Sequence, residues 1–192
     1  MSAITQGYLD AQEPARSPSP DSVALPRGEF RIVDPRDPIA APLLHDLERE
    51  YDTRYGTVGG DSASTEMNRY PAELFLAPVG AFVVLIDDGQ VVAGGAFMRY
   101  DDRTAEFKRI WTRTDHRGRG LGKRVLVELE ARARALGYSD VFLTTGPRQP
   151  EAVALYRSAG YTHLYTPEDD VQRGSRGFGV HGFGKPLGGD TP

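Results

Sequence analysis

The segment Arg117-Gly118-Arg119-Gly120-Leu121-Gly122-Lys123 lies between a predicted strand and a predicted helix. Its three glycines allow tight turns and a close approach of the backbone to a ligand, because glycine has no Cβ. The helix that follows presents unpaired N–H groups and the positive end of its dipole, and both favour a phosphate. Seven of the 23 basic residues fall between Lys108 and Arg124, where random placement would give about two. This segment therefore predicts a phosphate or pyrophosphate site.

Two common phosphate-binding motifs do not fit this loop. A P-loop needs a glycine five positions before its Gly-Lys pair and Ser or Thr after the lysine. Around Gly122-Lys123 these positions hold Arg117 and Arg124. The dinucleotide fingerprint needs a glycine three residues after Gly120, where Lys123 stands, and a parallel βαβ unit instead of the predicted meander. We therefore expect a pyrophosphate loop of another class.

Hydrophobic periodicity and turn residues place the other elements around this loop. The predicted strands are 30–33, 81–86, 91–100, 105–112, 141–145, 161–165 and 178–183. The predicted helices are 37–51, 120–136 and 150–159, with a short helix at 64–70 inside the loop 56–78. The pair Gly94-Gly95 inside a strand indicates a bulge or a close backbone approach. This order predicts an α+β fold, with a mixed and mainly antiparallel sheet of six to seven strands and helices on both faces.

Length and composition indicate one folded domain. The chain has 192 residues, of which 39% are hydrophobic, a net charge of −4 and no cysteine. We expect a flexible tail at 1–29, the domain at 30–187 and a short C-terminal tail at 188–192. The longest apolar run, Ala81–Ile86, is too short to span a membrane. We expect a soluble cytoplasmic protein that does not bind membranes or, given its acidic balance, nucleic acid.

Other catalytic classes find little support in the sequence. No cysteine is available as a nucleophile or a metal ligand. No Gly-x-Ser-x-Gly motif is present, so a covalent acyl-enzyme is not expected. The histidines do not show the spacing of metal ligands, and we predict no metal site. They are His45, His116, His163 and His181.

Two motifs resemble the GNAT superfamily of acyl-CoA-dependent N-acetyltransferases. That family's pyrophosphate loop, Gln or Arg followed by x-x-Gly-x-Gly or Ala, matches 117–122. Its second signature, Asn-x-x-Ala-x-x-Leu-Tyr and then Gly and an aromatic residue, matches 149–156 and Gly160-Tyr161, with Gln149 replacing the asparagine. The resemblance covers about 30–187. It implies the GNAT fold and transfer of acetyl from acetyl-CoA directly to an amine in a ternary complex.

The resemblance also implies roles for individual residues. Tyr156 would be the general acid near the CoA sulfur, against the alternative of a core aromatic residue. Glu106 would be the base, directly or through water, although Lys108 on the same strand face could simply pair with it. Trp111 is better explained by packing than by catalysis. The implied acetyl-CoA-binding residues are Ile110, Trp111, Thr112, Arg117, Gly118, Arg119, Gly120, Leu121, Gly122, Lys123 and Gln149.

Several alternatives remain open at this stage. The chain could be a non-catalytic acyl-CoA-binding or sensing module of the same fold, or it could use a larger acyl group. The acceptor could be a small-molecule amine or a protein amine, and the resemblance makes a homodimer possible. Acidic residues in the loops 56–78 and 166–177 weakly favour a cationic acceptor, although such loops are commonly acidic without a function. These residues are Asp61, Glu66, Glu73, Glu168, Asp169 and Asp170.

Overall fold

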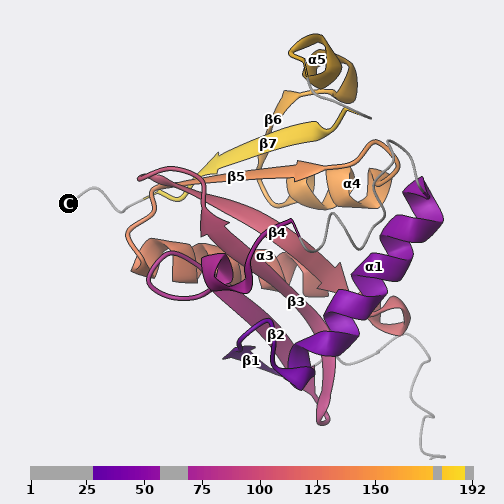
Figure 1. Ribbon diagram of the computed structural model, residues 1–192, viewed down its shortest axis with the longest axis vertical. Helices are drawn as coiled ribbons and strands as arrows, with labels where there is room; N and C mark the ends of the chain where they lie inside the picture. Colours follow the sequence, from indigo (N-terminus) through magenta and orange to yellow (C-terminus); the bar gives the residue numbers. More distant parts are fainter. Residues whose placement is uncertain (1–27, 57–68, 175–178, 189–192) are drawn as a thin grey trace, which may run out of the picture.

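A seven-stranded sheet forms the centre of the molecule (Figure 1). The computed structural model describes residues 28–56, 69–174 and 179–188. The strands are β1 (Glu29–Ile32), β2 (Ala81–Asp87), β3 (Gln90–Arg99), β4 (Thr104–Thr112), β5 (Asp140–Thr145), β6 (Thr162–Tyr165) and β7 (His181–Pro186). Their order in the sheet is β1-β2-β3-β4-β5-β7-β6. All neighbours are antiparallel except β4 and β5, which confirms the predicted mixed and mainly antiparallel sheet.

Helices cover both faces of this sheet. The helical elements are η1 (Pro38–Ala40), α1 (Ala41–Tyr55), η2 (Ala72–Phe75), η3 (Thr114–His116), α3 (Leu121–Ala135), α4 (Pro150–Ser158) and α5 (Pro167–Gln172). Side chains of α3 and α4 join one apolar core, and those of α1 and η2 join a second core on the opposite face. No helix in the described part of the chain has both the length and the apolar character needed to cross a membrane.

The parallel pairing of β4 with β5, the only one among the described strands, is short. β4 and β5 pair over four positions, from Thr104 opposite Asp140 to Phe107 opposite Leu143. Beyond that point the end of β5 pairs only with β7, and Lys108–Thr112 of β4 pair with β3 alone. The two strands therefore separate toward their C-terminal ends. We call this opening the split.

The two glycines of β3 explain how both helical layers approach the sheet. A Cβ on Gly94 would lie 2.6 Å from a Leu43 methyl group of α1, and one on Gly95 would lie 3.0 Å from a Val125 methyl group of α3. The pairing of β3 with β4 shifts between Gly94 and Ala96, where Arg109 has a positive φ of 60°. A side chain at either glycine would push a helix away, so the predicted bulge and close approach are both present.

Some element boundaries differ from the prediction. α1 continues to Tyr55, one turn beyond the predicted end, and Gly56 with φ of 56° ends it. The acidic segment 168–170, predicted as a loop, lies in helix α5, because Thr166 and Asp169 form a capping box around Pro167. β7 begins at His181, later than predicted. Most of the predicted helix 64–70, and Phe178, lie outside the described residues.

Candidate active site

The glycine-rich loop has the backbone predicted for an anion site. Gly118 and Gly120 have φ of 77° and 74°, a region that favours glycine, and a Cβ on either would meet no atom within 4 Å. Gly120 is the N-cap of α3 and provides no side-chain cap. The first N–H groups of α3 therefore face this open loop without a capping side chain, as a bound anion would require. Lys123 is exposed beside them.

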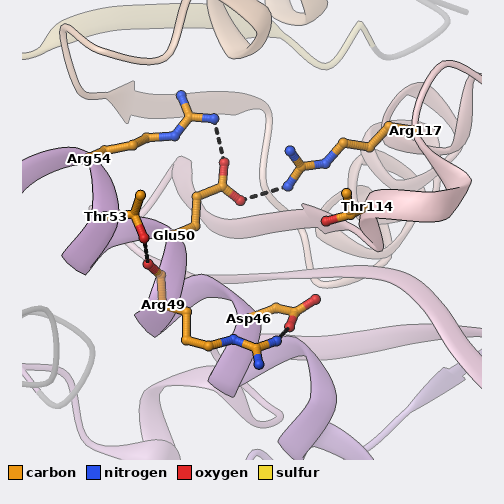
Figure 2. A pocket seen from close by; sticks show the side chains of 7 residues that line it. All are labelled: Asp46, Arg49, Glu50, Thr53, Arg54, Thr114 and Arg117. Atoms are coloured by element: carbon orange, nitrogen blue, oxygen red, sulfur yellow. Dashed lines mark hydrogen bonds and ion pairs between the residues drawn. The ribbon is translucent and has the colours of Figure 1, made fainter.

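Arg117, the first residue of the loop motif, is joined to α1. Its Nη2 donates to Glu50 Oε2 at 2.7 Å, and its Nε donates to the Thr112 carbonyl at 3.3 Å. A cavity of about 310 Å³ lies between α1 and this loop (Figure 2). Its lining residues are Asp46, Arg49, Glu50, Thr53, Arg54, Thr114 and Arg117. Charged groups thus converge from α1 and from the loop beside the expected pyrophosphate position.

Arg54 extends this ion-pair network across the split. Its Nη2 contacts the other oxygen of Glu50 at 2.5 Å, as Figure 2 shows, and also pairs with Glu151 at the start of α4. Its Nη1 donates to the Arg148 carbonyl at 2.6 Å. The C-terminal turn of α1 therefore contacts the loop after β4 on one side and the β5–α4 loop on the other. The network places α1 across the open end of the split.

The side chain of Gln149 stabilises the turn that leads into α4 by hydrogen bonds. Its Oε1 accepts from Thr145 Oγ1 at 2.8 Å and from the Gly146 N–H at 3.1 Å. The side-chain oxygen therefore holds the turn, which leaves the amide N–H₂ group for any contact with a cofactor.

Tyr156 lies in α4 beside the split and is 6% exposed. Its ring packs against Tyr161 and Phe183, with centroids 6.0 and 5.4 Å away. Burial raises the pKa of the Tyr156 hydroxyl, and the nearby Tyr51 hydroxyl raises this pKa further. Tyr51 belongs to α1, which packs on the opposite face of the sheet. The two tyrosines therefore belong to helices that cover opposite faces of the sheet.

Glu106 lies on the face opposite to Tyr156, next to the start of the split. It is 8% exposed, and its Oε1 pairs with Lys108 Nζ at 2.7 Å. The Lys108 ammonium also lies 4.7 Å from the centre of the Tyr70 ring. The structural alternative predicted for Glu106, a pair with Lys108, is therefore present. A base function requires that Glu106 exchange this partner.

The end of β4 borders the split. Thr112 and Ile110 are half-buried, whereas Trp111 is 3% exposed in the core between α1 and the sheet. This agrees with a packing role for the Trp111 ring, although its Nε1 is buried without a hydrogen-bond partner. The backbone of 108–112 has no partner strand on the β5 side, so it can accept an extended ligand there.

Two groupings near the site were not predicted. His163 Nε2 and His181 Nδ1 lie 3.1 Å apart, and Arg157 Nη2 lies 3.2 Å from His163 Nδ1. Glu50 and Arg54 also were not recognised, because their partners lie 67 and 94–97 positions away in the sequence. Neither grouping has a local sequence signal. Within the described ranges, no group of three or more His, Asp or Glu is placed to hold a metal.

Several acidic residues of the predicted acceptor side have structural partners. Glu73 pairs with Arg36 at 2.7 Å, and Asp169 caps α5 through Thr166. Asp170 accepts from the Val180 N–H at 3.0 Å. These carboxylates therefore give little support to a cationic acceptor. Asp61 and Glu66 lie outside the described residues.

Comparisons with known proteins agree with this geometry. The family described as "Acetyltransferase (GNAT) family" matches residues 43–161. An "IAA acetyltransferase" of Azospirillum brasilense is 33% identical over 110 residues, which cover 50% of this chain and 72% of that protein. A Streptococcus agalactiae acetyltransferase structure has a TM-score of 0.61 at 21% identity, covering 82% of this chain and 97% of its own. A GNAT acetyltransferase from Elizabethkingia anophelis with acetyl-CoA bound has a TM-score of 0.56 at 14% identity, covering 82% and 97%. The chain therefore belongs to the GNAT family of acetyltransferases.

Proposed function

We propose that this protein transfers acetyl from acetyl-CoA directly to an amine acceptor in a ternary complex. The observation that carries the proposal is the split between β4 and β5, which has an anion-binding loop at one end and Tyr156 beside it. An extended acyl-CoA arm between the strands would have its pyrophosphate at the N-terminus of α3. The backbone at Ile110–Thr112 would bind the arm and the thioester carbonyl. The Elizabethkingia relative, which binds acetyl-CoA, supports this assignment.

The chemistry needs one proton acceptor and one proton donor. The free amine attacks the thioester carbon, a C–N bond forms, and the C–S bond breaks. The amine proton goes to Glu106, directly or through a water molecule, and the departing thiolate takes a proton from Tyr156. The raised pKa of Tyr156 keeps its hydroxyl protonated at neutral pH, as a general acid must be.

The pyrophosphate loop can be tested by calorimetry. We expect the purified chain to bind acetyl-CoA and CoA with micromolar affinity and to show no comparable binding of ATP. Arg119→Glu places a negative charge beside the loop and should weaken CoA binding by about tenfold or more. Arg103→Glu makes the same charge change at an exposed position before β4, at the end of that strand opposite the loop, and should bind CoA like the wild type. Absence of binding by the wild type would overturn the proposal.

Thiol release distinguishes an enzyme from a sensing module. A catalyst releases CoA thiol when an amine is added to the acetyl-CoA complex, whereas a sensing module binds acetyl-CoA and releases no thiol with any amine. The same assay with propionyl-CoA and longer acyl-CoA donors measures the depth of the acyl pocket. Peptides with free amines, compared with small amines, separate protein from small-molecule acceptors.

A further inference from the structure

An aromatic surface lies on the face of β5, β7 and β6 opposite α4. Phe142 of β5 contacts the ring of Tyr100 at 5.0 Å. Leu164 and Tyr165 lie over Gly184 and Gly182 of β7, whose missing side chains leave room for them. Tyr100 is 59% exposed and Leu164 is 50% exposed. We call these four residues, Tyr100, Phe142, Leu164 and Tyr165, the aromatic shelf.

The Glu106–Lys108 ion pair lies at the edge of the aromatic shelf. Glu106 is directly opposite Phe142 in the pairing of β4 with β5, one position before the split opens. The side chains of Glu106 and Lys108 are only 11% and 18% exposed. Phe142, which is opposite Glu106, also contacts the ring of Tyr100, so the ion pair and the aromatic shelf are close enough to contact one small ligand.

The described helices leave the aromatic shelf accessible. α1 packs on β3 and β4, and α4 covers the other face of β5 and β7. α5 extends beyond the edge strand β6 (Figure 1), and its Arg173 guanidinium lies 4.9 Å from the centre of the Tyr165 ring. The aromatic shelf thus has the largely buried Glu106–Lys108 ion pair at one side and Arg173 at the other. It lies beside the proposed reaction centre.

From this arrangement we infer that the acceptor is an α-amino acid with an aromatic or large apolar side chain. This inference rests on the proposed acetyl transfer. An α-amino acid carries an ammonium and a carboxylate on neighbouring atoms, which complements the neighbouring carboxylate of Glu106 and ammonium of Lys108. The apolar side chain of the acceptor would cover the exposed parts of Tyr100 and Leu164.

The carboxylate of the acceptor also gives Glu106 a route to act as the base. In the structure the Lys108 ammonium forms an ion pair with the Glu106 carboxylate. An acceptor carboxylate that binds Lys108 releases Glu106 to accept a proton from the α-amino group. The amine then attacks the acetyl carbon, the C–S bond breaks, and the products are the N-acetyl amino acid, CoA thiol and one proton. A simple amine lacks the carboxylate and leaves Glu106 paired.

The acceptors that isolate each feature are L-phenylalanine, 2-phenylethylamine and L-serine. L-phenylalanine carries every expected feature, 2-phenylethylamine lacks the carboxylate, and L-serine lacks the apolar side chain. In a thiol-release assay we expect kcat/KM for L-phenylalanine to exceed both others by at least about tenfold. Calorimetry with the CoA-saturated protein should show binding of L-phenylalanine without turnover.

Two variants test which residues contact the carboxylate and the side chain of the acceptor. Lys108→Met should reduce the preference for L-phenylalanine over 2-phenylethylamine to nearly one, with CoA affinity as in the wild type. Tyr100→Ser, at an exposed position, should reduce the preference for L-phenylalanine over L-serine. Arg31→Met on β1 removes one positive charge at the far edge of the sheet and serves as the control.

Each outcome bears on one proposal. Equal rates with 2-phenylethylamine, or a preference that survives Lys108→Met, would overturn the amino-acid acceptor while leaving acetyl transfer intact. Binding of acetyl-CoA with no thiol release from any of the three acceptors would overturn it as well. A wild-type protein that does not bind acetyl-CoA would instead overturn the proposed function.

Discussion

The two oxygens of Glu50 bind two arginines that belong to opposite sides of the split. Oε2 accepts from Arg117 of the glycine-rich loop at 2.7 Å, and Oε1 contacts Arg54 at 2.5 Å (Figure 2). Arg54 in turn pairs with Glu151 of α4. In the ligand-free protein a carboxylate thus holds an arginine that the pyrophosphate would also attract. We therefore expect Glu50 to compete with the cofactor phosphates for Arg117.

Removing this competitor should strengthen CoA binding. We expect Glu50→Gln to lower the Kd for CoA by about threefold to tenfold, because one negative charge near the phosphates is lost. Glu48→Gln removes the same charge from another position of α1 and is the control. S-acetylpantetheine, which lacks the phosphates, should bind both variants alike. Weaker binding of CoA by Glu50→Gln would show that Glu50 positions Arg117 instead.

The hydroxyl of Tyr156 should matter for turnover and little for binding. Tyr156→Phe is expected to lower kcat by about tenfold to a thousandfold, with the Kd for acetyl-CoA nearly unchanged. Because burial raises the Tyr156 pKa above its usual value of 10, the wild-type kcat should show no alkaline decrease up to pH 10 from this group. Turnover of the variant at the wild-type rate would remove the acid assignment.

The buried carboxylate of Glu130 needs its cationic partner. Glu130 on α3 is 5% exposed and accepts from Tyr161 at 2.9 Å and from Lys185 of β7 at 2.8 Å. Lys185→Met should lower the free energy of unfolding by about 2–3 kcal/mol, because it leaves a buried charge without its main partner. Thermal denaturation should show a Tm lower by roughly 5–10 °C. Lys185→Arg keeps the charge and should recover most of the loss.

His181 should make stability depend on pH. Its Nδ1 lies 3.1 Å from His163 Nε2, and Arg157 Nη2 lies 3.2 Å from His163 Nδ1. Burial lowers the His181 pKa, as does His163, while Glu168 opposes the shift. As pH falls, His181 binds a proton in the unfolded chain at a higher pH than in the folded protein. The free energy of unfolding therefore decreases as pH falls from about 6.5 toward the lowered pKa.

The measurement is the difference in Tm between pH 7.5 and pH 5.5. His181→Gln should reduce this difference by about 2 °C or more. His45→Gln, at an exposed position of α1, is the control and should leave it unchanged. An equal decrease in both variants and the wild type would show that His181 does not cause the loss of stability in this range.

The parts of the site that depend on local sequence were predictable. The glycine-rich loop, the succession of strands along the chain and the bulge at Gly94-Gly95 follow from residue types and spacing, and the structure has them. The capping box at Thr166 and Asp169 was also readable, since Ser or Thr three positions before an acid starts helices. The prediction of an acidic loop at 168–170 did not use this signal.

The contacts that complete the site were not predictable from one sequence. Glu50 meets Arg117 only because α1 crosses the sheet and ends at the split. His163 meets His181 only because β6 and β7 pair side by side. Charge and spacing along the chain do not predict such contacts, because the contacts arise from the packing of elements that are far apart in the sequence.

The short pairing of β4 with β5 has a consequence for the whole domain. Past Phe107 and Leu143 the described parts of β4 and β5 are not paired with each other. An acyl-CoA arm lying there would supply the backbone partners that the two strands lack, and the substrate would act as an eighth strand. The sheet would then be continuous only while an acyl donor is bound. Slower amide hydrogen exchange in 108–112 would therefore report a bound acyl donor.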